Sequence, residues 1–160
     1  MEQISIMKKY LIAISLLPAS LFFIACGNSS SANSEPASTT FASTGADGKS
    51  GIGKFTKVEL NTPLDEAMVA NGEKIFTSKC LQCHKLTDEK LVGPGWKGVT
   101  SRFTPEWIMN FTTNTEYMLN NDVKAKALLA TWLVKMPPPN LADEEARAVL
   151  EFMRKNDGEK

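Results

Sequence analysis

The sequence predicts an all-α domain after residue 54, and three observations support this prediction. Helix-capping signals such as Thr104-Pro105-Glu106 place a hydroxyl acceptor, a proline and an acidic residue at the start of a helix. Apolar residues recur at intervals of three and four, which is the period of a helix face. No segment has the pattern of a buried strand. The domain is therefore expected to consist of helices and loops.

The first helix is expected to begin at Leu64, after a capping threonine and a proline in Thr62-Pro63. Met68, Gly72 and Phe76 recur every four residues and lie on one face of this helix. A glycine inside a helix weakens it by about 1 kcal/mol relative to alanine. The position of this glycine on the apolar face therefore indicates close contact with another helix.

Three more helical segments follow. The first is capped by Thr104 and interrupted at residues 112–115, and the second is expected over residues 123–134. The third is capped by Asn140, and the acidic residues 143–145 favour its N-terminus. The apolar stripe of the second helix is expected to be Val123, Ala127, Ala130 and Val134, and the buried face of the third Ala146, Val149, Leu150, Phe152 and Met153.

The most informative stretch is Cys80-Leu81-Gln82-Cys83-His84. C-x-x-C-H is the sequence at which haem is covalently attached. Two thiols three positions apart lie on one side of a helical turn, where both can form thioethers with the vinyl groups at one edge of a porphyrin. The adjacent imidazole can then coordinate the iron as its proximal ligand. The sequence predicts one covalent haem c on Cys80 and Cys83, with His84 as a ligand.

Two other interpretations of this motif are weaker. A thioredoxin-like dithiol needs a β-α-β context, whereas the residues that follow are helical and loop-like. A zinc site needs a fourth ligand, but the sequence has no second histidine, and its remaining cysteine, Cys26, lies far away in a different kind of segment.

Three stretches together resemble class I cytochromes c, which are small monohaem electron carriers of bacteria. They are Gly72-Glu73-Lys74-Ile75-Phe76, the C-x-x-C-H motif and Gly93-Pro94-Gly95-Trp96-Lys97-Gly98-Val99, and the resemblance extends from about residue 64 to residue 155. It implies the class I cytochrome c fold, with three to five helices around one haem. It also implies that the carbonyl of Pro94 accepts a hydrogen bond from the ring N–H of His84, and that Phe152 of the last helix meets Gly72 and Phe76.

The sixth iron ligand is expected to be Met136, in the stretch Lys135-Met136-Pro137-Pro138-Pro139-Asn140. A methionine thioether is a common sixth ligand in electron carriers, and His84 is the only histidine in the sequence. Pro137 disfavours a helical conformation at Met136, and three successive prolines favour a stiff extended path. The stretch also resembles the Met-Pro ligand loop of the family. The competing ligands are Met109, Met118 and Met153, each in a predicted helix where packing is the usual role.

Residues 1–25 have the features of an export signal. Met7-Lys8-Lys9 precedes an apolar stretch that is interrupted by Pro18 and is shorter than the roughly 20 residues of a membrane-spanning helix. The stretch ends in Phe23-Ile24-Ala25-Cys26-Gly27, which resembles a bacterial lipobox, so Cys26 is expected to carry lipid. The alternative is ordinary signal cleavage nearby, with Cys26 as a free thiol.

A tether is expected over residues 26–54, ahead of a cytochrome domain at residues 55–160. Within residues 27–53, 19 of 27 are Ser, Thr, Gly or Ala, which cannot bury enough apolar surface to offset the entropy of ordering. As a flexible coil, this tether would hold the domain on the order of 30 Å from the lipid. The tether then allows movement between membrane partners or serves as a spacer alone.

Charge and ligation together predict a non-enzymatic electron carrier. Residues 55–160 carry 14 Lys and Arg against 15 Asp and Glu, so no basic field favours nucleic acid. Ligation by His84 and Met136 leaves no open iron position for a substrate. The expected partners are a terminal oxidase, a nitrogen-oxide reductase or a quinol-linked donor, on the periplasmic side of a bacterial membrane. Lys79, Lys85 and Lys97 either frame the exposed haem edge or are ordinary solvated surface residues.

Two alternatives remain at this point. A five-coordinate haem enzyme or gas sensor would leave the sixth iron position free, although the sequence has no second histidine for distal acid–base chemistry. A passive lipid-anchored binding module would not exchange electrons. Trp107 and Trp132 are expected in the core, and a haem propionate is the alternative hydrogen-bond partner for either indole N–H.

Overall fold

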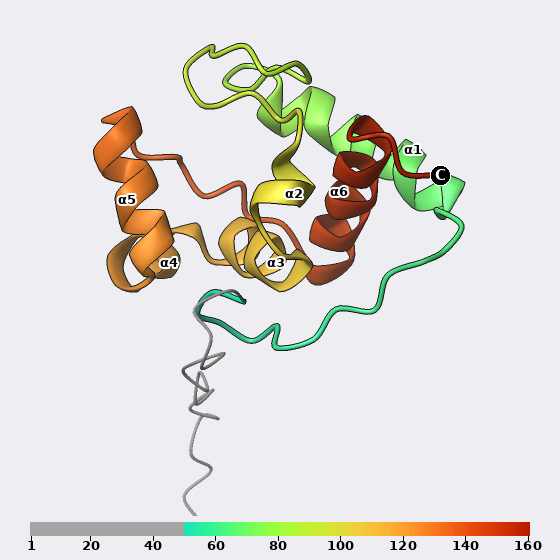
Figure 1. Ribbon diagram of the computed structural model, residues 1–160, viewed down its shortest axis with the longest axis horizontal. Coiled ribbons are helices and arrows are strands. Elements are labelled where there is room, and N and C mark those ends of the chain that lie inside the picture. Colours follow the sequence, from blue (N-terminus) through green and yellow to red (C-terminus); the bar gives the residue numbers. More distant parts are fainter. Residues whose placement is uncertain (1–49) are drawn as a thin grey trace, which may run out of the picture. The chain divides into compact units, whose positions relative to one another are not determined.

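A computed structural model describes residues 50–160, which form an all-helical domain without strands (Figure 1). The all-α prediction is confirmed. The predicted signal peptide at residues 1–25, the lipidation at Cys26 and residues 26–49 of the tether lie outside the described residues. The elements are α1 (Glu66–Ile75), the π-helical segment η1 (Phe76–Cys80), α2 (Val99–Arg102), α3 (Pro105–Thr113), α4 (Thr115–Asn121), α5 (Val123–Trp132) and α6 (Asp143–Asn156).

The described residues contain six α helices, more than the three to five expected. The additional helices are short: α2 is a single turn, and α3 and α4 are separated only by Asn114, which has a non-helical backbone. The start of α3 is as predicted, with the Thr104 hydroxyl accepting a hydrogen bond from the Trp107 N–H. None of the described helices combines the length and the apolar content needed to cross a membrane.

Helices α1 and α6 pack against each other in the most extensive contact between two helices of the described domain (Figure 1). A Cβ built on Gly72 would overlap the Ala148 carbonyl oxygen and would lie 2.7 Å from Cβ of Phe152. The rings of Phe76 and Phe152 lie 5.7 Å apart between centroids. Gly72 therefore permits a close helix contact, as the sequence predicts, and the expected inner face of α6 is buried.

Two predicted helix starts are wrong, because other side chains provide the caps. The α1 helix begins at Glu66 rather than Leu64, since the Asp65 carboxylate caps it by accepting hydrogen bonds from the N–H groups of Ala67 and Met68. Contrary to the prediction, the α6 helix is not capped by Asn140, which lies outside the helix with a positive φ of 50°. The helix follows Ala142, whose N–H donates to the Glu145 carboxylate at 2.9 Å.

The predicted apolar stripe of α5 is also wrong. Its four members are exposed, and Val123 is 80% accessible. The inner face instead carries Ala125, which is fully buried, with Leu128 and Leu129 packed against the core. Both sets have helical spacing, but only the second presents leucines, which bury more apolar surface than alanines.

Residues 50–58 lie against α3 as a strap. The Asn110 side chain, 1% exposed, accepts from the Phe55 N–H and donates to the carbonyls of Ser50 and Phe55. A Cβ on Gly53 would overlap the Asn110 amide oxygen. Farther along, the Val58 N–H donates to the Glu106 carboxylate. Residues 50–54, assigned to the tether from the sequence, thus contact the helical domain.

A buried charge cluster joins α6 to the start of α1. The Glu151 carboxylate is fully buried and accepts from Arg147 at 2.5 Å, Arg154 at 3.0 Å and the Asp65 N–H at 3.1 Å. Burial acts to raise the pKa of Glu151, but the hydrogen bonds from Arg147 and Asp65, the charge of Arg147 and the Arg154 bond together lower it below its usual value. Glu151 is therefore ionised at neutral pH.

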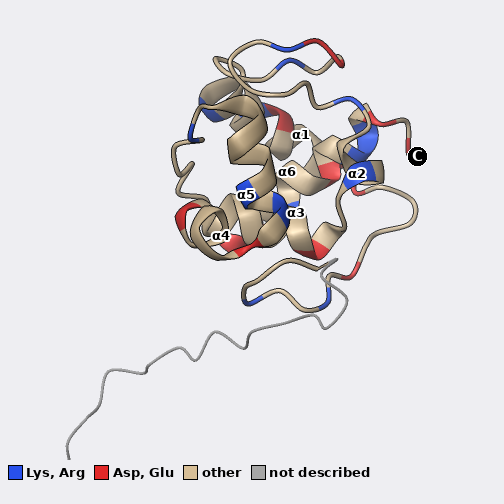
Figure 2. Cartoon of the chain, turned by 60° about the vertical axis from the view of Figure 1, so that its left-hand side comes forward, with Lys and Arg blue, Asp and Glu red and all other residues tan. Residues whose placement is uncertain are grey.

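Outside this cluster, basic and acidic residues are interspersed over the described domain (Figure 2).

Candidate functional site

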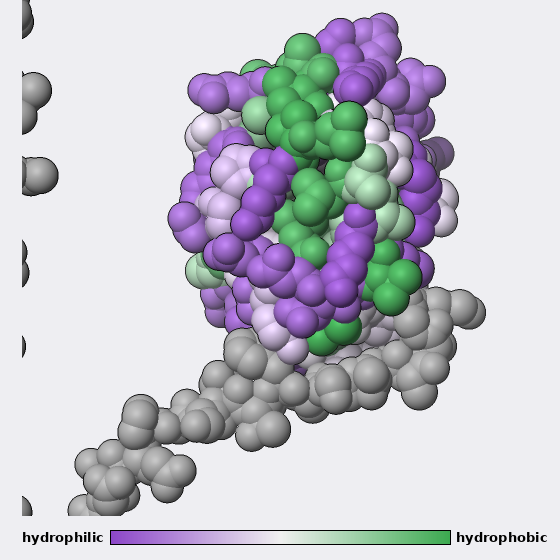
Figure 3. Space-filling model, turned by 90° about the vertical axis from the view of Figure 1, so that its left-hand side faces the viewer, coloured by the Kyte–Doolittle hydropathy of each residue, from purple (hydrophilic) through white to green (hydrophobic). Residues whose placement is uncertain are grey.

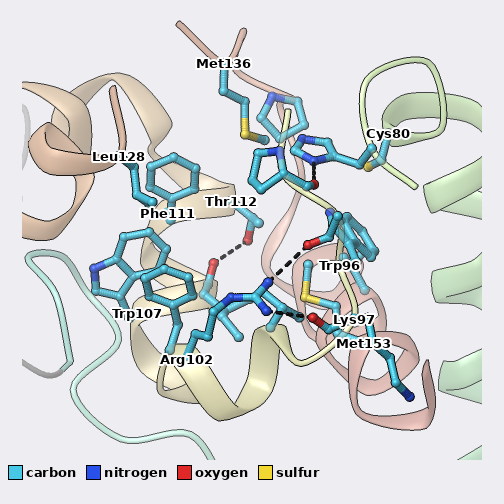
Figure 4. Close-up of a pocket in the computed structure, with 18 of the residues that line it drawn as sticks. Cys80, Trp96, Lys97, Arg102, Trp107, Phe111, Thr112, Leu128, Met136 and Met153 are labelled. Carbon is cyan, nitrogen blue, oxygen red and sulfur yellow. Dashed lines mark hydrogen bonds between the residues drawn. The ribbon is translucent and has the colours of Figure 1, made fainter. Parts of the chain in front are cut away.

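The predicted site residues of the described domain gather around two cavities that share part of their lining. Cys80, His84, Pro94 and Met136 line the larger cavity of about 440 Å³. Cys83, His84, Pro94 and Met136 line the smaller one of about 110 Å³. Figure 4 shows the Met136 sulfur pointing into this space from one side and Cys80 on the other side.

A single turn carries the two cysteines and the histidine. The η1 segment widens the end of α1, with the Leu81 N–H donating to the Phe76 carbonyl at 2.9 Å. The N–H groups of Cys83 and His84 both donate to the Cys80 carbonyl, at 3.0 and 2.9 Å. Backbone hydrogen bonds therefore hold the C-x-x-C-H residues as the compact turn that the sequence predicts.

The surroundings of Cys80 do not favour a thiolate site. Burial raises the pKa of the Cys80 thiol to about 11, outweighing the opposing effect of the Lys79 charge. A free thiol at this position stays protonated at neutral pH. In the part of the chain that the structure describes, no group of three or more His, Cys, Asp or Glu is arranged to hold a metal ion, which gives no support to the zinc alternative.

The segment after the motif fixes the imidazole. His84 Nδ1 lies 2.8 Å from the Pro94 carbonyl oxygen, as the resemblance implies. That oxygen can only accept, so Nδ1 carries the proton and Nε2 retains the lone pair that a metal requires. The Gly93 N–H donates to the Cys83 carbonyl at 2.9 Å, and a Cβ on Gly93 would lie 2.5 Å from His84 Cε1. Glycine is therefore required here for the chain to approach the ring.

Trp96 supports the histidine, a role that was not assigned from the sequence. Its buried ring lies 4.6 Å from the Phe76 ring and 6.0 Å from the His84 ring, measured between centroids. The backbone N–H of Trp96 donates a hydrogen bond to the Lys85 carbonyl at 2.8 Å. The tryptophan thus connects the imidazole to the contact between α1 and α6.

A stack of three aromatic rings forms another wall of the larger cavity. Phe103 and Trp107 lie 4.2 Å apart and Trp107 and Phe111 4.8 Å apart, with nearly parallel planes. The Trp107 Nε1–H donates to Asp122 at 3.1 Å, so Trp107 is a core residue with its donor already paired. The spacing of four residues between Phe103, Trp107 and Phe111 is the signal in the sequence that could have predicted this wall.

Trp132 is half-buried, lines both cavities and has Lys90 Nζ 4.9 Å from its ring centroid.

The methionines differ in their access to the cavities. Met118 is fully buried, and its sulfur accepts the Ile52 N–H at 3.3 Å, while Met109 is buried and lines neither cavity. Met153 lines the larger cavity and Met136 lines both. Met136 is thus the one methionine among these four that shares both cavities with His84.

The residues around the cavities fit haem c. Most of the lining is apolar, and 440 Å³ falls within the range of about 300–1,000 Å³ for ligand sites. Two thiols on one turn supply the attachment points, and imidazole and thioether side chains supply ligands that haem iron accepts. On the face with α4 and α5, Figure 3 shows a hollowed apolar band flanked by hydrophilic side chains. Half-exposed Val92 and Val134 line the smaller cavity.

An all-helical domain with a single C-x-x-C-H turn beside an apolar cavity defines a class I monohaem c-type cytochrome. The chain belongs to the cytochrome c family, whose family model matches residues 69–157. Its cofactor is one covalently bound haem c, and the protein is a haem c electron carrier.

Solved structures agree with this assignment. Cytochrome c from Rhodothermus marinus is 34% identical, and the match covers 66% of this chain and 90% of that chain with a TM-score of 0.63. An engineered cytochrome c from Rhodothermus marinus has the same identity and coverage with a TM-score of 0.61. A further engineered form, bound to the carbene intermediate 1-ethoxy-1-oxopropan-2-ylidene, also has that identity and coverage, with a TM-score of 0.60. A search of curated proteins found no match.

Proposed function

We propose that this cytochrome transfers single electrons through an iron that is ligated by His84 and Met136, with thioethers at Cys80 and Cys83. The observation that carries the proposal is that Met136 and the turn bearing His84 line the same two cavities. When bound, haem c supplies one iron that changes between ferrous and ferric states. Neither ligand has to rearrange between these states, which suits rapid electron transfer.

The chain's own residues set the ligand properties. The Pro94 carbonyl holds the proton on His84 Nδ1 and makes the opposite nitrogen the better donor. The thioether of Met136 and the apolar wall of Phe103, Trp107 and Phe111 disfavour the additional positive charge of ferric iron. A high reduction potential follows, which suits the oxidising end of a respiratory chain.

The partners are proposed from the N-terminal sequence and the function class. Lipid on Cys26 would hold the protein at the periplasmic side of a bacterial membrane. The donor and acceptor would be membrane-associated respiratory proteins, such as a quinol-linked donor and a terminal oxidase or nitrogen-oxide reductase. Contact would be small and transient. Of the lysines expected near the haem edge, Lys79 bonds to the Pro139 carbonyl, Lys85 to Glu89 and Lys97 to the Asn156 carbonyl.

The ligand assignment is tested by visible spectroscopy of the oxidised protein. Wild type is expected to show the far-red sulfur-to-iron charge-transfer band, and Met136→Ala to lose it. Met153→Leu is the matched control, since Met153 also lines the larger cavity, and it should retain the band. A band that survives in Met136→Ala but disappears in Met153→Leu would transfer the ligand role to Met153.

A second candidate is a five-coordinate haem enzyme or gas sensor. It is favoured by the sparse anchoring of the Met136 segment: among the described residues, the backbone of residues 134–140 takes part in one hydrogen bond, from Lys79. Carbon monoxide separates the two functions. A firmly ligated electron carrier should bind it weakly in the ferrous state, whereas a five-coordinate protein should bind it at once.

A further inference from the structure

We propose that Lys79 is a positioning residue that holds Met136 in place as an iron ligand, by tying the ligand segment to the turn that carries the haem. This role presupposes the ligation by Met136 proposed above. The tie is the hydrogen bond from Lys79 Nζ to the Pro139 carbonyl oxygen, at 3.2 Å.

The segment that carries Met136 has few other polar attachments. It lies between α5 and α6 and has no regular secondary structure. Three of its residues are prolines, which have no N–H to donate. Within the described part of the chain, no backbone–backbone hydrogen bond involves residues 134–140. Beside Met136, the Lys135 side chain pairs with Glu116 at 3.2 Å, both side chains being exposed. Among the described residues, the Lys79 bond is therefore the one hydrogen bond made directly to this backbone.

The position of the bond makes it effective at Met136. Pro139 is three residues beyond Met136, and Pro137, Pro138 and Pro139 have fixed φ angles, so the intervening chain is stiff. A restraint at the Pro139 carbonyl is thereby transmitted to Met136. Both Pro139 and Met136 line the larger cavity.

The other end of the bond is equally well placed. Lys79 is the penultimate residue of η1, directly before Cys80, which is buried on the wall of the same cavity. The hydrogen bonds from Cys83 and His84 to the Cys80 carbonyl hold this turn. Lys79 thus links the side of the cavity that carries the histidine to the side that carries the methionine.

The experiment uses the haem-loaded protein with three variants. Lys79→Met removes the ammonium group and retains the apolar stem, and Lys79→Arg retains a donor. Lys85→Met is the matched control, because it removes the same charge close to the same turn while its partner is Glu89. Two quantities are measured on the ferric protein. The first is the affinity for added imidazole, which has to displace Met136. The second is the pH midpoint at which the far-red band disappears as the pH is raised.

The expected result is specific to the lost hydrogen bond. Lys79→Met should bind imidazole about three- to tenfold more tightly than wild type and should lose the band at lower pH. Lys79→Arg and Lys85→Met should stay within about twofold of wild type. Circular dichroism of each variant checks that the helices are intact.

Two results overturn the proposal and are distinguishable. If wild type shows the band, Met136→Ala loses it and Lys79→Met equals wild type in both measurements, Met136 is the ligand but Lys79 does not position it. The same conclusion follows if Lys85→Met changes both quantities as much as Lys79→Met does. If wild type lacks the band, the proposed ligation and the role of Lys79 fail together.

Discussion

His84 Nδ1 and the Pro94 carbonyl oxygen lie 2.8 Å apart across a loop of ten residues. This contact decides which imidazole nitrogen can face a metal, and it depends on the close approach of Gly93 to the ring. A backbone carbonyl cannot be removed by substitution, so the neighbouring glycine is the position at which the contact can be tested.

Gly93→Ala is expected to displace the imidazole, because the new Cβ would lie 2.5 Å from His84 Cε1. Crowding of this kind costs about 1–3 kcal/mol of folding stability. The midpoint of urea unfolding and the reduction potential should both fall. Gly158→Ala is the control: its φ of 99° strains an alanine and should also lower the urea midpoint, but nothing lies within 4 Å of the new Cβ, so the potential should be unchanged. An unaltered potential in Gly93→Ala would show that the loop tolerates the methyl group.

Gly72→Ala tests the contact between α1 and α6. Alanine is the better helix former by about 1 kcal/mol, but its Cβ would overlap the backbone carbonyl of Ala148. Packing should dominate, with a net loss of roughly 1–3 kcal/mol in the free energy of unfolding. Denaturant titration measures this difference. A stabilised variant would mean that α6 can move away without cost.

Glu151→Gln is expected to destabilise the protein at neutral pH by about 3–5 kcal/mol, since it leaves Arg147 and Arg154 without their buried anionic partner. The pKa of Glu151 is lowered in the folded protein, so its contribution is complete above the ordinary glutamate pKa. That contribution is lost as pH falls through the lowered folded value.

The free energy of unfolding, measured against pH, should therefore decline less on the acid side in Glu151→Gln than in wild type. Glu89→Gln is the control, because Glu89 is exposed and pairs only with Lys85 among the residues described; it should change the profile little. Parallel acid profiles for wild type and Glu151→Gln would contradict the assignment.

Asn110→Ala is expected to release residues 50–58 from α3, since three hydrogen bonds to this strap are lost. Trypsin should then cleave after Lys54 or Lys57 faster than in wild type, by tenfold or so if about 1.4 kcal/mol of local stability is lost. Asn121→Ala removes an exposed bond to the Tyr117 carbonyl and should leave cleavage unchanged. Equal rates in all three proteins would show that packing alone holds the strap.

The parts of the fold and site that the sequence predicted are those set by short-range chemistry. The turn from Cys80 to His84 is determined by residues within one helical turn, whereas the Pro94 contact was implied by the resemblance to class I cytochromes c. Gly72 signalled a close helix contact because a glycine on an apolar helix face weakens the helix and leaves room for a neighbouring backbone.

The remainder depends on contacts that spacing alone does not encode. Thr62 and Asp65 both have side chains that can cap a helix, and the sequence does not show which of them caps α1. In the structure Asp65 is the cap, and its N–H also donates a hydrogen bond to Glu151, 86 residues away. In α5, apolar residues have helical spacing on two faces, so spacing alone does not show which face is buried. The buried face is the one that carries Leu128, which lines both cavities. Asn110 had no sequence signal, since its partners are backbone groups of a Gly- and Ser-rich segment.

The strap also determines how the domain bears a mechanical load. A pull on the chain from the side of residue 50 meets Asn110 and then Glu106 before it reaches α1. The force therefore enters α3, whose Trp107 lines the larger cavity and donates a hydrogen bond to Asp122. A cytochrome held by its N-terminal side would thus transmit a pull to the aromatic wall of its haem cavity first.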